Sequence, residues 1–210
     1  MSVNRGARGS ANSMRNAPTK SYCSVGNFST TARLCSAIYR QVRQYQMALT
    51  DLFVREVFLQ RPSAALKVHA AATAVWQLGL QCEITGPGGE KAVTDMSPPM
   101  GGEGAGASAG WLLRASLASC AATAIAMRAA QRGIELHCLE VTVHGELDGR
   151  GLVGIDGVST AHRQRMWIRI GAHDVSDERL RELAETGEAI SPVGCTLRER
   201  PPMALEVSVV

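Results

Sequence analysis

The sequence lacks the cysteine patterns of two protein classes. It contains no CxxC pair and no Cys/His cluster at zinc spacing, which argues against a structural metal. Its six cysteines are too sparse over 210 residues for the disulfide framework of a small secreted domain. They are Cys23, Cys35, Cys82, Cys120, Cys138 and Cys195. We therefore expect a reducing, cytoplasmic environment and no bound metal.

Long apolar runs are also missing. The longest uncharged, mostly apolar stretch lies between Arg114 and Arg128, well short of the roughly 20 residues that cross a bilayer. No segment has the apolar core of a secretory signal. Apolar residues still make up 45% of the chain, enough for a sizeable core. The sequence predicts a folded protein with no membrane span and no membrane partner.

Acidic residues are absent from the first 50 positions, which hold seven basic ones. The other 160 residues carry 15 basic and 19 acidic side chains, a net charge of −4, although the whole chain has +3. A folded body with that charge has no electrostatic attraction for phosphate groups. Nucleic acid is therefore not an expected partner.

Residues 1–46 differ in composition from the rest of the chain. They are rich in Ser, Arg, Asn and Gly and have no apolar periodicity before Ile38, so they do not bury enough surface to fold alone. This fits an organelle transit peptide, which is rich in Arg and Ser and poor in acids. It also fits a disordered tail, or a start codon placed too early with Met47 as the natural start. Both interpretations stay open, and the folded domain is expected over residues 47–210.

The first part of that domain predicts a short helix, a β-hairpin and a loop. The helix is expected at 52–60, and β-rich residues at 66–85 and 90–94 flank a Gly-Pro-Gly-Gly turn. The glycine-rich residues 98–110 match neither GxxxxGK[ST] nor a dinucleotide GxGxxG context. We therefore expect a flexible lid there, with no phosphate-bearing cofactor.

The second part contains the strongest helical pattern, from Trp111 to Arg132. It is rich in Ala and Leu, has no internal Gly or Pro, and is followed by Gly133 at the position of a C-cap. Its middle is apolar nearly all round, which predicts burial on most faces. The remaining predicted elements are strands at 136–147 and 166–170, helices at 176–188 and from 192 to about 198, and a terminal strand at 204–209. This order indicates an α+β fold.

Three segments carry a specific combination of motifs. Residues 95–120 read DMSPPMGGEGAGASAGWLLRASLASC: an acidic residue, a glycine-rich loop and a cysteine on a helix. Residues 129–154 read AAQRGIELHCLEVTVHGELDGRGLVG: a helix end and a strand. Residues 175–207 read VSDERLRELAETGEAISPVGCTLRERPPMALEV: a helix pair and a final strand. In this order they resemble the OsmC/Ohr superfamily of osmotically inducible and organic hydroperoxide resistance proteins.

The resemblance implies an OsmC-like fold, in which antiparallel sheets wrap around two central helices of an intertwined homodimer, with sites at the subunit interface. It also implies a reaction. In active relatives a helix thiolate attacks an organic hydroperoxide, a second cysteine resolves the sulfenic acid as a disulfide, and an arginine and a glutamate help to lower the pKa of the thiol.

Cys120 matches the reactive cysteine of that family by its position on the central helix. Its neighbours one turn away are Ser116, Leu117, Thr123 and Ala124, and none supplies positive charge. A thiol in apolar surroundings is inert without such help. Cys120 is therefore either the nucleophile or a small core residue.

The sequence departs from the family at the resolving position. Peroxidatic members have Cys-Pro there, whereas this chain has Ser191-Pro192, and Ser191 cannot form a disulfide. Cys195 lies four residues further on, about one helical turn along the same face. It is either a displaced resolving thiol or a packing residue.

The activating residues are also altered. Where many relatives have Pro-Glu before the apolar helix, this chain has Gly110-Trp111, and tryptophan cannot accept a hydrogen bond as a carboxylate does. Glu103 in the glycine-rich loop is a candidate substitute, and Trp111 and Ser116 are candidate pocket residues. Arg114, six positions from Cys120, does not share its helix face.

Two hypotheses follow for the function. The first is a thiol-dependent hydroperoxide reductase in oxidative stress defence, weakened by Ser191, with Cys120 as nucleophile and an external thiol as reductant. The second is a non-catalytic OsmC-like dimer that binds a small hydrophobic molecule.

Overall fold

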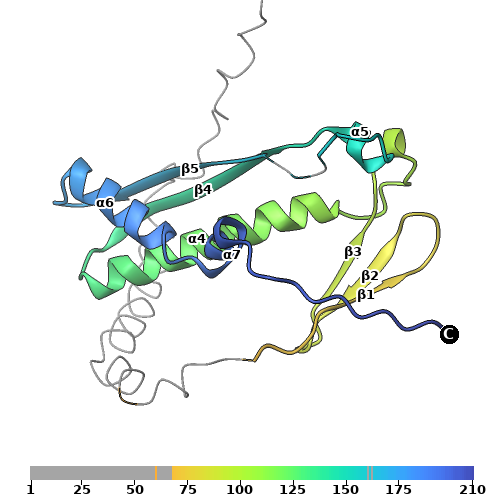
Figure 1. The fold of residues 1–210 in the computed structure, drawn as a ribbon. Helices are drawn as coiled ribbons and strands as arrows, with labels where there is room; N and C mark the ends of the chain where they lie inside the picture. Colours follow the sequence, from red (N-terminus) through yellow and green to blue (C-terminus); the bar gives the residue numbers. More distant parts are fainter. Residues whose placement is uncertain (1–59, 61–67, 160, 162) are drawn as a thin grey trace, which may run out of the picture. The chain divides into compact units, whose positions relative to one another are not determined.

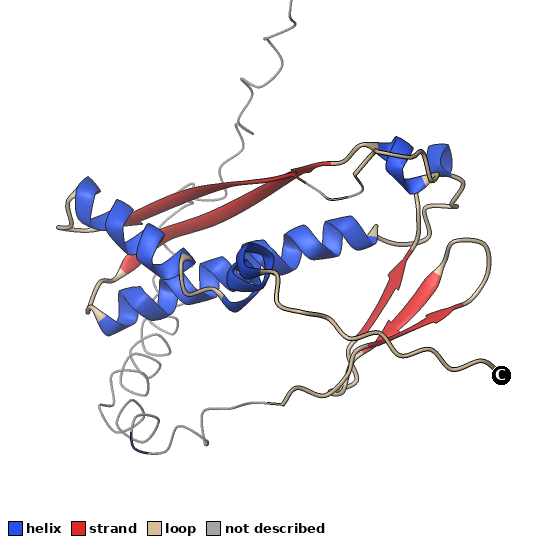
Figure 2. Ribbon diagram, viewed as in Figure 1, coloured by secondary structure: helices blue, strands red, loops and turns tan. Residues whose placement is uncertain are grey.

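The computed structural model describes Gln60 and residues 68–159, 161 and 163–210. The predicted helix at 52–60, apart from Gln60, and the interpretations of residues 1–46 lie outside this part. The described chain combines antiparallel strands with helices, as Figures 1 and 2 show. The predicted α+β class is confirmed.

The first three strands form an antiparallel sheet in the order β1-β2-β3. They are β1 (Thr73–Trp76), β2 (Cys82–Thr85) and β3 (Lys91–Thr94). Gly79 (φ +59°) and Gly89 (φ +88°) lie in the two turns, where a left-handed backbone favours glycine. The predicted hairpin is therefore present, and every residue of β1 is exposed.

Asp95, directly after β3, fixes the glycine-rich loop. Its buried carboxylate accepts hydrogen bonds from three backbone N–H groups, those of Met96 (2.7 Å), Glu103 (3.0 Å) and Ala105 (3.0 Å). A Cβ on Gly102 would collide with the backbone of Met96, so this close turn requires glycine. The loop contains the 3-10 helix η1 (Pro98–Met100). It is thus a hydrogen-bonded connection and not the free lid that its composition suggested.

The central helix α4 (Ala109–Gln131) begins two residues before its predicted start. The Ser108 hydroxyl caps it by accepting a hydrogen bond from the Trp111 N–H at 3.1 Å. The chain leaves the helix at Gly133, which has a φ of +66°. Both ends follow from local sequence.

The second sheet pairs β4 (Leu136–Glu146) with β5 (Arg163–Ala172) in antiparallel register. Both strands were predicted, although β5 begins three residues earlier than expected. The short helix α5 (Gly149–Leu152) was not predicted. Its cap, Asp148, accepts a hydrogen bond from the Arg150 N–H at 3.0 Å.

The predicted helix pair near the C-terminus is present as α6 (Asp177–Glu188) and α7 (Pro192–Glu199). The hydroxyls of Ser176 and Ser191 cap them, each accepting a backbone N–H at 3.4 Å. Proline occupies the first position of α7, where its missing N–H costs nothing.

One face of α4 is buried within the chain, where the helix contacts β4, α6 and α7. The buried residues are Leu117, Ala121, Ala124, Ile125 and Ala129. At Gly187 of α6, a Cβ would lie 2.7 Å from the Cα of Ile125, so the two helices meet backbone to backbone. The opposite face is exposed at Ser119, Thr123 and Met127. The prediction of burial on most faces is therefore wrong for the single chain.

The terminal strand predicted at 204–209 is not formed. Residues 200–210 contain no helix or strand, and the segment runs as a loop in Figure 2. Its alternating large side chains are almost fully exposed, at Met203 (90%), Leu205 (82%), Val207 (78%) and Val209 (90%). The alternation suits a strand, but a strand also needs a neighbouring edge to pair with.

Helix α4 is long and apolar enough to cross a membrane, judged by length and composition alone. The uncharged segment between Arg114 and Arg128 is shorter than the helix, which has 23 residues. The core helix of a globular protein passes the same test, and α4 packs one face against α6 and β4. The finding is therefore weak support for a membrane span.

Candidate functional site

Cys120 lies in the middle of α4 and is partly buried. Among its neighbours one turn away, Leu117 and Ala124 belong to the buried face, whereas Ser116 and Thr123 are exposed. The sulfur thus lies at the border between the two faces of the helix. The described residues give it no hydrogen bond and no nearby cation.

The three candidate pocket residues make no polar contact with Cys120 in the described part of the chain. Trp111 is nine residues earlier on α4, about 14 Å along the axis, and its side chain is 52% exposed. Glu103 donates its backbone N–H to Asp95 and leaves its side chain exposed. Ser116, also exposed, lies one turn from Cys120. A single chain does not assemble these residues around the sulfur.

Ser191 has a structural place in the fold. Its side chain is fully buried, and its hydroxyl accepts the Gly194 N–H at the start of α7. The residue at the resolving position of the family therefore works here as a helix cap.

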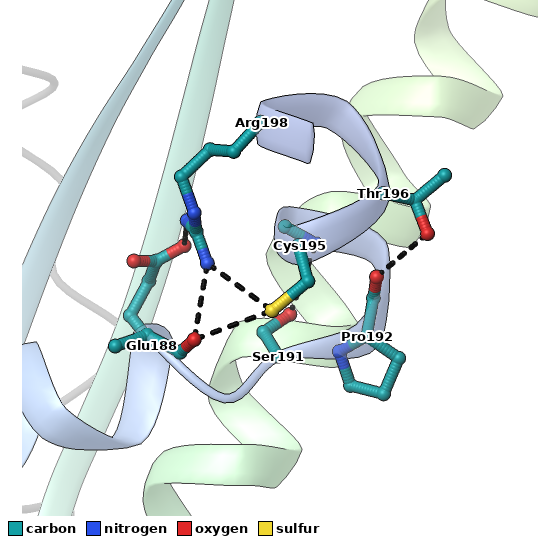
Figure 3. A network of polar contacts seen from close by, with 8 residues as sticks. Glu188, Ser191, Pro192, Cys195, Thr196 and Arg198 are labelled. Atoms are coloured by element: carbon teal, nitrogen blue, oxygen red, sulfur yellow. Dashed lines mark hydrogen bonds and ion pairs between the residues drawn. The ribbon is translucent and has the colours of Figure 1, made fainter. Parts of the chain in front are cut away.

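Cys195 lies in a network of polar contacts, which Figure 3 shows. Arg198, one turn further along α7, donates from Nη2 to the Cys195 sulfur at 3.5 Å and to the Ala189 carbonyl at 3.2 Å. Its Nη1 donates to Glu188 Oε1 at 2.6 Å. The Cys195 thiol itself donates to the Ala189 carbonyl at 3.3 Å. A thiol, a guanidinium and a carboxylate thus meet where α6 ends and α7 begins.

The guanidinium of this network is firmly charged. The hydrogen bond that Arg198 donates to Glu188 raises the pKa of Arg198 above its ordinary value, and the contact with Cys195 acts in the same direction. Because Glu188 and the Ala189 carbonyl both hold the guanidinium, the charge is fixed beside the sulfur.

Arg198, which contacts Cys195, and Glu188, which holds Arg198, were not predicted as site residues. The spacing of Cys195 and Arg198 places them on one helix face, so helical periodicity could have found that pair. Glu188 lies across the break between α6 and α7, and only the angle of that break brings it to Arg198. No local pattern encodes that angle.

An open pocket of about 980 Å³ adjoins this network. Its walls come from α4, β5, α6 and α7, and they include Leu113, Leu117, Met166 and Ile168 as well as Glu188 and Arg198. Gln164 of β5 also lines it, and both polar atoms of its amide are buried without a hydrogen-bond partner in the structure. The pocket therefore combines apolar walls with polar groups at one side.

The described residues contain no group of three or more His, Cys, Asp or Glu side chains that could hold a metal ion.

Solved structures of similar fold include two OsmC-like proteins. The protein from Mycoplasma pneumoniae is 16% identical, with a TM-score of 0.54 over 63% of this chain and 89% of that one. The protein of unknown function from Vibrio cholerae is 14% identical, with a TM-score of 0.50 over 62% of this chain and 94% of that one. An organic hydroperoxide resistance protein from Legionella pneumophila is 18% identical, with a TM-score of 0.49 over 63% and 92%.

No curated protein matches the chain. The family model described as OsmC-like protein matches residues 102–206, half of the sequence. The match spans the glycine-rich loop, both cysteine-bearing helices and the second sheet, which are the elements that carry the resemblance seen in the sequence. The chain belongs to the OsmC-like protein family.

Proposed function

We propose that this protein is a thiol-dependent organic hydroperoxide reductase that works as a homodimer, with Cys120 as the attacking thiol. The observation that carries the proposal is the placement of Cys120 in an OsmC-like chain. The residue is partly buried, at the border of a helix face that the described residues leave exposed. A cysteine that served only as core packing would be sealed by its own chain.

The proposed reaction oxidises sulfur and reduces a peroxide by two electrons. The Cys120 thiolate attacks one peroxide oxygen, the O–O bond breaks, and the alkoxide leaves and takes up a proton to become the alcohol. The product on the protein is a sulfenic acid. Because Ser191 cannot form a disulfide, an external thiol condenses with the sulfenic acid and releases water, and a second thiol then restores Cys120.

Several exposed surfaces support a second copy of this chain as the partner. The open face of α4 carries small residues that allow close helix contact, and β1 exposes Val75 (52%) and Trp76 (66%). The segment 203–209 has the alternating pattern of a strand but forms none among the described residues. Patches of this kind on one protein are typical of an interface. A partner helix over the α4 face would also bring new groups to Cys120.

Thiol reactivity tests the proposal. In the full-length protein, Cys120 should react with iodoacetamide below pH 7, and cumene hydroperoxide should be consumed. Cys120→Ser should abolish consumption, whereas the matched control Cys82→Ser, a partly buried cysteine of β2, should leave it unchanged. The reductase proposal fails if iodoacetamide alkylates Cys120 only at about pH 9 or above, where an ordinary cysteine is also a thiolate, and if cumene hydroperoxide leaves Cys120 reduced.

The open pocket favours a second candidate, a dimer that binds a small hydrophobic molecule without turnover. Its apolar walls suit such a ligand. The described residues also give Cys120 no hydrogen-bond partner. Calorimetry with cumyl alcohol, the product analogue that cannot oxidise a thiol, distinguishes the two. Binding of the alcohol together with an inert Cys120 would favour this candidate over the reductase.

A further inference from the structure

A second thiol lies where α6 meets α7. We propose that Cys195 is a reactive thiol in its own right, oxidised by hydroperoxides that enter the adjoining pocket, and that Arg198 is the positioning residue that makes it reactive. The proposal concerns a site separate from Cys120 and does not depend on the chemistry proposed there.

A positive charge, that of Arg198, lies beside the Cys195 sulfur. The nucleophilic form of cysteine is the thiolate, and a neighbouring guanidinium stabilises it. Arg198 Nη2 already lies 3.5 Å from the Cys195 sulfur. Glu188 and the Ala189 carbonyl hold the guanidinium in that place, so it needs no rearrangement when the thiol loses its proton.

Two groups oppose this effect. The Ala189 carbonyl accepts the thiol proton at 3.3 Å and so favours the protonated form, and the Glu188 carboxylate offsets part of the guanidinium charge. A sulfur–carbonyl hydrogen bond is weak, whereas a charge-assisted contact to a thiolate is strong. Glu188 binds the Nη1 side of the guanidinium and leaves Nη2 on the sulfur side. The guanidinium therefore keeps an N–H donor directed at the Cys195 sulfur.

The adjoining pocket offers a ligand access to this network. Arg198 and Glu188 line the open pocket of about 980 Å³, as do the residues on either side of Cys195. Gln164 contributes a separate observation, because its buried amide in the pocket wall has no hydrogen-bond partner. A ligand with a polar end would satisfy that amide, and its apolar body would lie against residues such as Met166 and Ile168. A small organic hydroperoxide has this form.

The reaction balances without a further reactant. The Cys195 thiolate attacks the terminal oxygen of the hydroperoxide, an S–O bond forms as the O–O bond breaks, and the alkoxide takes up a proton and leaves as the alcohol. The sulfur loses two electrons and becomes a sulfenic acid. Its new oxygen is a hydrogen-bond acceptor beside the donors of Arg198.

Sulfenic acid trapping tests the proposal in the full-length protein that carries Cys120→Ser. The protein is treated with cumene hydroperoxide and dimedone, and each cysteine is quantified by peptide mass spectrometry. We expect the Cys195 adduct to exceed that of Cys82 at least about fivefold. Arg198→Gln should reduce the Cys195 adduct to the Cys82 level. Arg179→Gln removes an exposed arginine of α6 that does not line the pocket, and it should not change the adduct.

Three outcomes would overturn the proposal. One is a Cys195 adduct that forms only when Cys120 is present, because Cys195 would then be a resolving thiol. Another is equal adduct formation in Arg198→Gln and Arg179→Gln, with folding verified by circular dichroism. The third is equal labelling of Cys195 and Cys82 in the protein that carries only Cys120→Ser. This comparison needs no arginine variant, so it tests the proposal even if Arg198→Gln does not fold. Hydroperoxide consumption by Cys195→Ser tests Cys120 separately.

Discussion

The two faces of α4 differ in how far the described part of the chain covers them. The buried face packs Ile125 and Leu117 against neighbouring elements, and the backbone of α6 approaches it at Gly187. The exposed face, with Ser119, Thr123 and Met127, has no comparable cover. Packing within the chain thus stabilises only one side of an otherwise evenly apolar helix. The other side is available for chemistry or for a second chain, and Cys120 lies on the border.

A pair of alanine substitutions on α4 tests this difference most strongly. Ile125 is fully buried, so Ile125→Ala removes packed methyl groups and leaves a cavity. It should lower the free energy of unfolding by about 2–5 kcal/mol. Met127 is 39% exposed, and Met127→Ala should cost less than about 1 kcal/mol in the monomer. Urea unfolding at low protein concentration measures both values.

The same pair of substitutions also tests the proposed homodimer. If a second copy covers the open face, Met127→Ala should weaken the association measured by analytical ultracentrifugation, and its effect on stability should grow with protein concentration. Equal losses for both variants at low concentration would show that the two faces are packed alike.

The next effect concerns the contact between α4 and α6. Gly187→Ala places a methyl group 2.7 Å from the Ile125 Cα, a backbone atom that cannot move without shifting the helix. The expected loss is about 1–3 kcal/mol, more than the gain of up to about 1 kcal/mol in helix propensity. Gly149 of α5 has open space around it, so Gly149→Ala is the control and should not destabilise the protein. Thermal unfolding of both variants checks the prediction, and a stabilised Gly187→Ala would contradict the close contact.

Much of the fold could be predicted from the sequence because its signals are local. Ser108, Ser176 and Ser191 mark three helix starts, and Gly133 marks the end of α4. The hairpin follows from its glycine turn. The alternation at 204–209 also indicated a strand, but pairing depends on an edge elsewhere, which local pattern cannot supply.

The site was less predictable for the same reason. The position of Cys120 on a helix, and the cap at Ser191, are properties of single segments. The contact between Glu188 and Arg198 depends on how two helices meet, and the open face of α4 depends on which neighbours the chain folds onto it. Composition showed that α4 was apolar all round. It did not show which side of the helix would pack against other elements of the chain.

The stability of the protein should depend on pH through Asp95, because this carboxylate fixes the loop that leads into α4. Hydrogen bonds from the backbone, the largest from Ala105, lower the pKa of Asp95 below its ordinary value although partial burial acts in the opposite direction. Its contribution to stability is therefore complete above the unfolded-state pKa of about 4 and is lost as the pH falls through the lower folded-state value.

Asp95→Asn should lower stability at pH 7 and flatten its loss between about pH 5 and pH 2, because the amide has no charge to lose. The exposed Asp156, changed to Asn, serves as the control. Unfolding free energies measured across this range give the result. Parallel curves for wild type and Asp95→Asn would show that the carboxylate does not hold the loop.

The smallest effect is expected at the N-terminus of α4. Ser108→Ala removes the oxygen that accepts the Trp111 N–H and should lower the free energy of unfolding by about 1 kcal/mol. Only the first turn loses its cap, and Cys120 lies twelve residues further along the helix, so its alkylation rate should equal that of wild type. Urea unfolding and iodoacetamide labelling of one preparation measure both quantities. A Cys120 rate that changed with the cap would mean that the open face is set by the helix start and not by the packing of the opposite side.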